Sequence, residues 1–119
     1  MAKHNTLGQL GEDEAVAYLI KKGYEILDRN YRYQKAEVDI LALKADVLTA
    51  VEVKTRSTTE FGNPQDFVKP KQIQRLVGAV DAFIGIHDLD VEVRFDIIAI
   101  VKTPSGFDIE HLEDAFYYF

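Results

Sequence analysis

The sequence predicts one α/β domain, in which helices cover a mixed β-sheet. The 119 residues suit a single compact domain over 1–119, and 47% hydrophobic and 29% charged residues is close to the globular average, so a real core is expected. Periodicity predicts a helix, three strands, a second helix and one or two further strands, in that order. Because a helix separates the last strands from the first three, parallel and antiparallel neighbours should both occur in the sheet.

The first helix is expected over residues 6–22. Asn5 or Thr6 can cap its start, and Gly23 is a suitable left-handed stop. The apolar residues that recur at helical spacing are Leu7, Leu10, Ala15, Tyr18 and Leu19.

Three strands should follow this helix. Residues 24–33 predict a short strand that runs into a polar, aromatic-rich segment. Residues 36–43 and 47–53 predict two strands of a β-hairpin, joined by residues 44–46. A loop is expected over 57–64.

The second helix is expected over residues 70–85, with Pro70 in its first turn. Residues 91–101 predict a strong strand, 104–106 a turn, and 107–111 a weaker strand. The apolar stripe of the helix consists of Ile73, Leu76, Val77, Val80, Phe83 and Ile84.

Composition narrows the class of protein. The absence of cysteine excludes disulfides and thiolate metal sites, and it suits a cytoplasmic protein. The chain contains no run of 18 apolar residues, so no transmembrane helix is expected. The N-terminus also lacks the apolar core of a signal peptide. We therefore expect a cytoplasmic protein that does not bind a membrane.

The charge is unevenly distributed. The net charge of −6 argues against nucleic acid as a partner. Residues 29–75, however, carry nine basic and six acidic groups, whereas residues 76–119 carry two basic and nine acidic groups. The positive charge is thus concentrated in the middle third, although a chance fluctuation of surface charge explains the same numbers.

Charged residues interrupt the apolar run of the second hairpin strand. Strand alternation places Glu52 and Lys54 on the face of Leu48 and Ala50. On the preceding strand, Glu37, Asp39, Leu41 and Leu43 should share a face, opposite Val38, Ile40 and Ala42. An antiparallel hairpin would bring Asp39 beside Glu52 and Glu37 beside Lys54.

Two interpretations of this charged end remain open. One is a solvated sheet edge with cross-strand ion pairs such as Glu37 with Lys54. The other is a divalent cation site, because two carboxylates about 4 Å apart repel by on the order of 4 kcal/mol. Protonation, Lys54 or a cation would relieve that repulsion, and a few oxygen ligands suit Mg²⁺ or Mn²⁺.

Asp39 followed by Glu52-Val53-Lys54 resembles the D…(E)xK signature of the PD-(D/E)XK nucleases. More closely, the chain resembles the small bacterial YraN-type family of predicted endonucleases, which is similar to archaeal Holliday-junction resolvases. At Ala36 that family usually has glycine. The matching residues are Gly8, Gly11, Glu12, Ala15, Tyr18, Leu19, Gly23, Tyr24, Ile26, Leu27, 29–32, 37–42, 51–56, Val68, Lys71 and 94–96.

The resemblance implies a restriction-endonuclease-like α-β-β-β-α-β core with a mixed central sheet flanked by helices. It also implies a catalytic site in which Asp39, Glu52 and the carbonyl of Val53 hold Mg²⁺ or Mn²⁺. Lys54 would position or help to deprotonate the attacking water. Glu12 resembles an additional acidic group of the family's site, but a plain exposed helix carboxylate is an equally good interpretation.

Cations of the middle third are candidates for substrate contacts. Lys69 and Lys71 lie at the expected start of the second helix, where a helix N-terminus can bind phosphate. Tyr31 and Tyr33 can stack on bases or simply pack. Further backbone contacts can come from Arg29, Arg32, Lys35 and Arg56.

The function implied by the resemblance is a metal-dependent endonuclease that acts on DNA rather than RNA, on branched or recombination intermediates. A nucleic-acid-binding module of the same fold with little or no cleavage is the alternative, and an adaptor that uses the acidic C-terminal third is another. The aromatic tail, 116–119, is expected to dock on the core, or else to form a homodimer or partner contact. Asp96 is expected to be structural, and no role is assigned to His4, His87 or His111.

Overall fold

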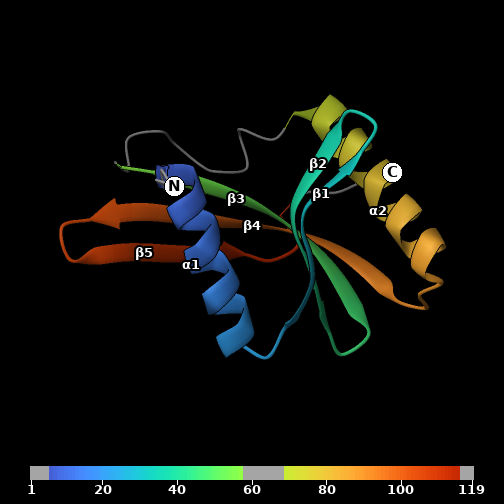
Figure 1. Ribbon diagram of the computed structural model, residues 1–119, viewed down its shortest axis with the longest axis horizontal. Helices are drawn as coiled ribbons and strands as arrows, with labels where there is room; N and C mark the ends of the chain where they lie inside the picture. Colours follow the sequence, from blue (N-terminus) through green and yellow to red (C-terminus); the bar gives the residue numbers. More distant parts are fainter. Residues whose placement is uncertain (1–5, 58–68, 116–119) are drawn as a thin grey trace, which may run out of the picture.

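The computed structural model, which describes residues 6–57 and 69–115, has a five-stranded sheet with a helix on each face (Figure 1). The strand order is β1-β2-β3-β4-β5, and neighbouring strands are antiparallel except β3 and β4, which are parallel. This confirms the mixed α/β class. The elements are α1 Leu7–Lys21, β1 Glu25–Tyr33, β2 Ala36–Lys44, β3 Val47–Arg56, α2 Pro70–His87, β4 Glu92–Thr103 and β5 Gly106–Leu112.

The core has two halves, one on each face of the sheet. On one face, Phe83 of α2 packs in a cluster with Phe95 of β4. On the other face, Leu19 of α1 packs with Ile98 and Ile100 of β4. Since both faces of the sheet are covered, a charged side chain on its inner strands lies close to low-dielectric surroundings.

Helix α1 begins and ends within one residue of the predicted bounds. The Thr6 hydroxyl caps it by accepting a hydrogen bond of 3.1 Å from the Gln9 N–H. Gly23 follows the helix with a φ of 96°, which glycine adopts without strain. A Cβ at Gly11 would overlap the Thr55 side chain, so this glycine allows α1 to lie directly on β3.

Helix α2 runs two residues beyond the predicted end, to His87, and Asp88 ends it in a left-handed conformation. Pro70 occupies its first turn, where its missing N–H needs no partner. No side chain caps the N-terminus at Lys69, and the first turn contains no acid. The start of α2 is therefore a positive end with no counter-charge of its own.

The turn between β2 and β3 is shorter than predicted. Lys44 belongs to β2 and pairs with Val47, so only Ala45 and Asp46 form the turn. Both have positive φ, 51° and 63°, as two-residue hairpin turns require. The chain spanning 24–33 is likewise more regular than predicted, because β1 continues through the polar segment to Tyr33.

The β1–β2 hairpin changes face midway, at Asn30 and Asp39. Val38 packs in the same cluster as Leu41, whereas Ile40 packs in the cluster on the opposite face. The predicted face of Val38 is therefore wrong. By the register of the neighbouring pairs Asn30 lies opposite Asp39, and its φ of 55° is a left-handed conformation that asparagine tolerates. Beyond this kink the tip of the hairpin lies beside the first turns of α2 (Figure 1).

Two predictions fall on segments outside the described residues. These are most of the loop expected over 57–64 and the contacts of the aromatic tail, 116–119. Neither helix among the described residues has the length and apolar character needed to cross a membrane.

Candidate functional site

Asp39 and Glu52 meet where the pairing of β2 with β3 ends. The last cross-strand pair in that direction is Ile40 with Val51, and the next two positions hold the two acids. Asp39 Oδ2 accepts a hydrogen bond of 2.8 Å from the Val53 N–H, in place of a strand partner. A cleft of about 340 Å³ opens beside this point and is lined by both acids. The end of the strand pairing thus creates the opening that exposes the acidic pair.

Glu52 is held by two donors but keeps one oxygen free. Its Oε2 lies 3.1 Å from Gln72 Nε2 and 3.5 Å from Lys54 Nζ. Its Oε1 is buried and has no hydrogen-bond partner among the described residues. A buried carboxylate oxygen without a partner is costly, so such an atom calls for a ligand or a proton. The sequence did not predict Gln72, because a polar residue outside the apolar stripe of a helix gives no periodic signal.

The pKa values of both acids are raised. Burial, together with the negative charge of Glu52, raises the pKa of Asp39 to about 7, although the hydrogen bond from Val53 opposes this. Burial also raises the pKa of Glu52, and the charge of Lys54 and the hydrogen bonds from Lys54 and Gln72 oppose it. Asp39 and Glu52 therefore lie close together, as expected, and their negative charges repel each other.

Lys54 faces Glu52 and not Glu37. Within residues 6–57 and 69–115, Glu37 has Arg32 as its ion-pair partner, at 3.6 Å. The expected Glu37–Lys54 pair is thus absent from this part of the chain, because the kink at Asp39 redirects the outer half of β2. Arg32 is 77% exposed, pairs with Glu37 and is not among the residues that line the acidic cleft.

Two residues of β1 donate hydrogen bonds to Glu12 of α1. It accepts hydrogen bonds from Arg29 at 2.8 Å and Asn30 at 3.2 Å, and its side chain is only 14% exposed. The interpretation as a plain exposed carboxylate is therefore wrong, and the charge of Glu12 contributes to the raised pKa of Asp39. No three acidic, histidine or cysteine side chains in the described ranges lie close enough to hold a metal ion, so Glu12 does not form such a group with the pair.

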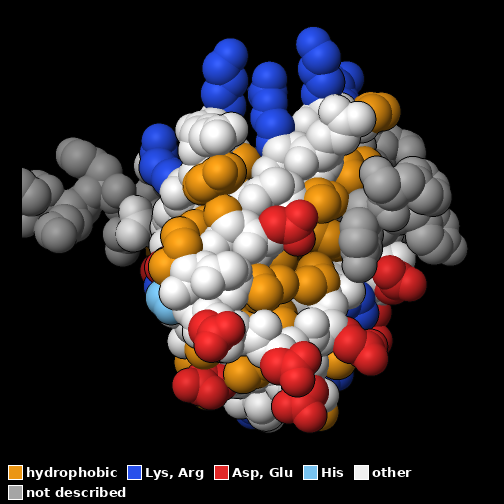
Figure 2. Space-filling model, turned by 90° about the vertical axis from the view of Figure 1, so that its right-hand side faces the viewer, with side chains coloured by type: hydrophobic (Ala, Val, Ile, Leu, Met, Phe, Trp, Pro, Cys, Tyr) orange, Lys and Arg blue, Asp and Glu red, His pale blue; other side chains and the backbone are white. Residues whose placement is uncertain are grey.

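The remaining predicted cations lie at the start of α2 and the end of β3. Lys69 is the residue before the helix and Lys71 lies in its first turn. Arg56 is the last residue of β3 and donates a hydrogen bond of 2.8 Å to the Thr55 carbonyl. Seen on the α2 side, Lys and Arg side chains gather at one end of the molecule and acids at the other (Figure 2).

A second polar cluster lies on the α1 face and surrounds Asp96. Asp96 is fully buried and accepts hydrogen bonds from Arg94 at 2.9 Å and from the Asp114 N–H at 3.0 Å, and it lies 2.7 Å from His111 Nε2. His111 Nδ1 lies 3.0 Å from the Tyr18 hydroxyl of α1. Burial alone would raise the pKa of Asp96, but the hydrogen bonds from His111 and Arg94 outweigh burial and lower it.

Asp96 is therefore structural, as expected. His111, to which the sequence assigned no role, also belongs to this cluster. His111 connects α1 to the buried acid and, through it, to the C-terminal segment. No sequence signal could reveal this contact, because Tyr18 and His111 are 93 positions apart.

Comparison with known proteins identifies relatives over the whole chain. The family model described as "Uncharacterised protein family UPF0102" matches residues 11–100. A "UPF0102 protein" of Christiangramia forsetii is 66% identical over 119 residues, which is 100% of both chains. Similar proteins of Flavobacterium psychrophilum (59% over 119 residues, 100% of both chains) and Phocaeicola vulgatus (50% over 117 residues, 98% of this chain and 97% of that one) carry the same family name, which states no activity.

Proposed function

The chain belongs to the uncharacterised protein family UPF0102, the YraN-type family that its motifs resemble, and we propose that it is a metal-dependent endonuclease that hydrolyses phosphodiester bonds of DNA. The observation that carries the proposal is the acidic pair of Asp39 and Glu52. Glu52 is buried and Asp39 is half-buried, the pKa values of both are raised, and Glu52 Oε1 has no partner within the described part of the chain. Such a pair is suited to a divalent cation.

The donors present fit Mg²⁺ or Mn²⁺. Glu52 Oε1 is buried and unpaired, and Asp39 has a second oxygen besides the one that accepts from Val53. With the Val53 carbonyl these groups supply a small set of oxygen ligands, which suits an ion that keeps several waters. Two carboxylates, rather than three, are consistent with a substrate phosphate that completes the site.

The chain's own residues would divide the remaining work. Mg²⁺ or Mn²⁺ bound there would supply Lewis acidity toward the scissile phosphate and would lower the pKa of the attacking water. Lys54, with its amine 3.5 Å from Glu52, would position that water and offset charge on the phosphate. Gln72 holds the Glu52 carboxylate in one orientation, and the lysines at the start of α2 would attract the substrate backbone.

A nucleic-acid-binding module with little or no cleavage is the second candidate. It is favoured because, among residues 6–57 and 69–115, no third acid lies close enough to hold a metal ion together with the pair, and by the net charge of −6. The mixed sheet with one helix on each face is compatible with a restriction-endonuclease-like core in both cases. Metal-dependent cleavage separates the two candidates, and metal binding is the first requirement for it.

A thermal melt with and without Mn²⁺ tests the metal site without requiring cleavage. At 100 times the dissociation constant, the ion should stabilise the fold by about 2.7 kcal/mol, a rise of roughly 10 °C for a domain of this size. Asp39→Asn keeps an acceptor for the Val53 N–H but removes the charge, so it should abolish the rise. Glu37→Gln, a nearby exposed acid, is the matched control and should retain it. An equal rise in all three proteins would rule out the site.

A further inference from the structure

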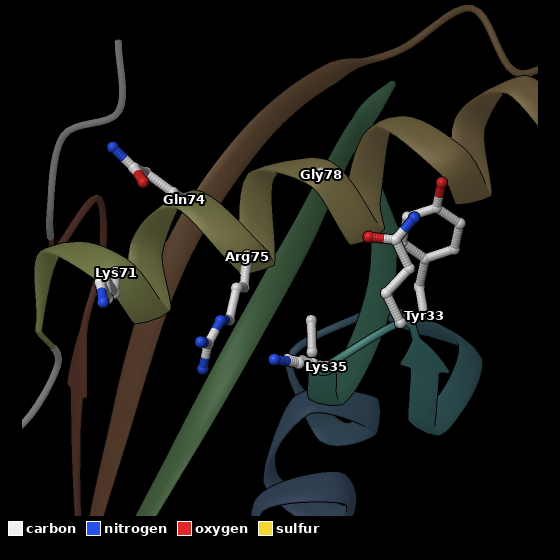
Figure 3. A pocket seen from close by; sticks show the side chains of 8 residues that line it. Tyr33, Lys35, Lys71, Gln74, Arg75 and Gly78 are labelled. Carbon is white, nitrogen blue, oxygen red and sulfur yellow. The ribbon is translucent and has the colours of Figure 1, made fainter.

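A second groove, of about 490 Å³, continues from the cleft of the acidic pair. Its walls are the β1–β2 turn, residues 33–36, and one side of α2 with Lys71, Gln74, Arg75 and Gly78 (Figure 3). We call it the basic groove. Residues 35, 36 and 75 line both this groove and the acidic cleft, so the two openings are continuous. Its volume lies in the range of about 300–1,000 Å³ typical of pockets for small organic ligands.

Three cations line the basic groove. Lys35 comes from the hairpin turn, and Lys71 and Arg75 come from successive turns of α2. Within residues 6–57 and 69–115, none of the three forms an ion pair or a side-chain hydrogen bond. Figure 3 shows Lys35 and Arg75 extended into the space between the turn and the helix. Like charges that converge in this way repel each other, and an anion would relieve the repulsion.

An aromatic ring and a glycine complete the groove. Tyr33 is 37% exposed, whereas Tyr31 packs edge-on against Phe83 in the core. Gly78 lies inside α2, where glycine lowers helix stability, yet a Cβ there would meet nothing within 4 Å. Packing therefore does not require glycine at this position. Because glycine has no side chain, the groove stays open beside Gly78.

We propose that the basic groove binds an unpaired stretch of DNA beside the phosphate that is cut, an inference that rests on the proposed nuclease function. Phosphates would lie near Lys35, Lys71 and Arg75, and a base would stack on Tyr33. Stacking on a protein ring requires a base that has left the duplex stack. The substrate class is consequently DNA with a single-stranded segment next to the cleavage site, such as a flap, a gap or a splayed junction arm, and not an uninterrupted duplex.

Binding measured in EDTA tests the groove independently of catalysis. The probes are a fluorescent oligothymidylate and a blunt duplex of the same length, followed by anisotropy. We expect the single strand to bind at least tenfold more tightly than the duplex. Three phosphate contacts predict a slope of about −2 for log K against log salt, and Lys71→Ala should reduce the slope by about 0.7.

Two glycines of α2 supply a matched pair of variants. A Cβ at Gly78 or at Gly85 meets nothing within 4 Å, but only Gly78 lines the groove. Both Gly78→Gln and Gly85→Gln should raise the melting temperature, because glutamine favours the helix. Gly78→Gln should also raise the dissociation constant for oligothymidylate at least tenfold, whereas Gly85→Gln should leave it unchanged.

The outcomes separate this inference from the proposed function. Three results would overturn the proposed role of the groove, even if the protein cleaves DNA. They are equal affinity for single strand and duplex, no binding of either, and the same dissociation constant for oligothymidylate in the two glutamine variants. Preferential single-strand binding that Gly78→Gln abolishes would support it, even if no cleavage is found.

Discussion

Asp39 lowers the stability of the folded protein at neutral and alkaline pH. Its pKa is raised from 3.8 to about 7 by burial and by the charge of Glu52. Between these two pH values the folded state holds a proton that the unfolded state has already released. Stability therefore falls as pH rises through this window, by a few kcal/mol at most. An acid kept at such a cost is a feature of functional sites.

Replacing this acid should consequently stabilise the metal-free protein. In EDTA at pH 8, Asp39→Asn should melt several degrees above wild type, because the charge is gone and the acceptor for Val53 remains. Near pH 4, where wild-type Asp39 is protonated in the folded state, the difference should shrink. Melting curves across this range give the measurement, with Asp108→Asn, at an exposed acid on β5, as the control. A variant that is less stable than wild type at pH 8 would show that Asp39 is a structural acid.

At the level of elements, the C-terminal hairpin is joined to α1 by the polar cluster around Asp96. The pKa of Asp96 is lowered, the opposite of Asp39, so its contribution to stability is present at neutral pH and is lost as the pH falls below the usual aspartate range. The cluster lies on the α1 face, whereas Glu52 contacts Gln72 of α2. The two sites can therefore be perturbed separately.

Asp96→Asn should destabilise the fold without removing the metal response. It leaves Arg94 without its buried partner, and breaking such a pair costs about 3 kcal/mol. Urea unfolding measures this loss, and Asp108→Asn, an exposed acid on β5, is the matched control. The Mn²⁺-dependent rise in melting temperature should persist in Asp96→Asn. Its disappearance would mean that the cluster and the acidic pair are coupled.

For the whole molecule, the sequence predicted the class, the element order and the proximity of Asp39 to Glu52. Strand alternation was sufficient for β3, where Leu48 and Ala50 share one face as expected, and that face packs against α2. It failed for β2, because the left-handed residue Asn30 on the neighbouring strand lies where the hairpin changes face. Contacts between distant segments, such as that of His111 with Tyr18, leave no periodic signal.

The charge distribution of the whole molecule also bears on function. Although the net charge is −6, Lys and Arg side chains gather at the end of the α2 face that carries the hairpin turn and the start of α2 (Figure 2). Acids at the opposite end would repel a nucleic acid. A substrate should therefore approach over the basic groove and in one orientation.

Cleavage of defined DNAs tests the central claim most directly. Four-way junction, flap, single-stranded and linear duplex DNA would be incubated with Mg²⁺ or Mn²⁺ and with wild type, Glu52→Ala or Lys54→Ala. We predict cleavage of the branched or single-stranded DNAs by wild type, a loss of at least a hundredfold in both variants, and no cleavage in EDTA. Cleavage that survives both substitutions, or no metal-dependent cleavage of any of these DNAs by a protein that binds Mn²⁺, would contradict the account.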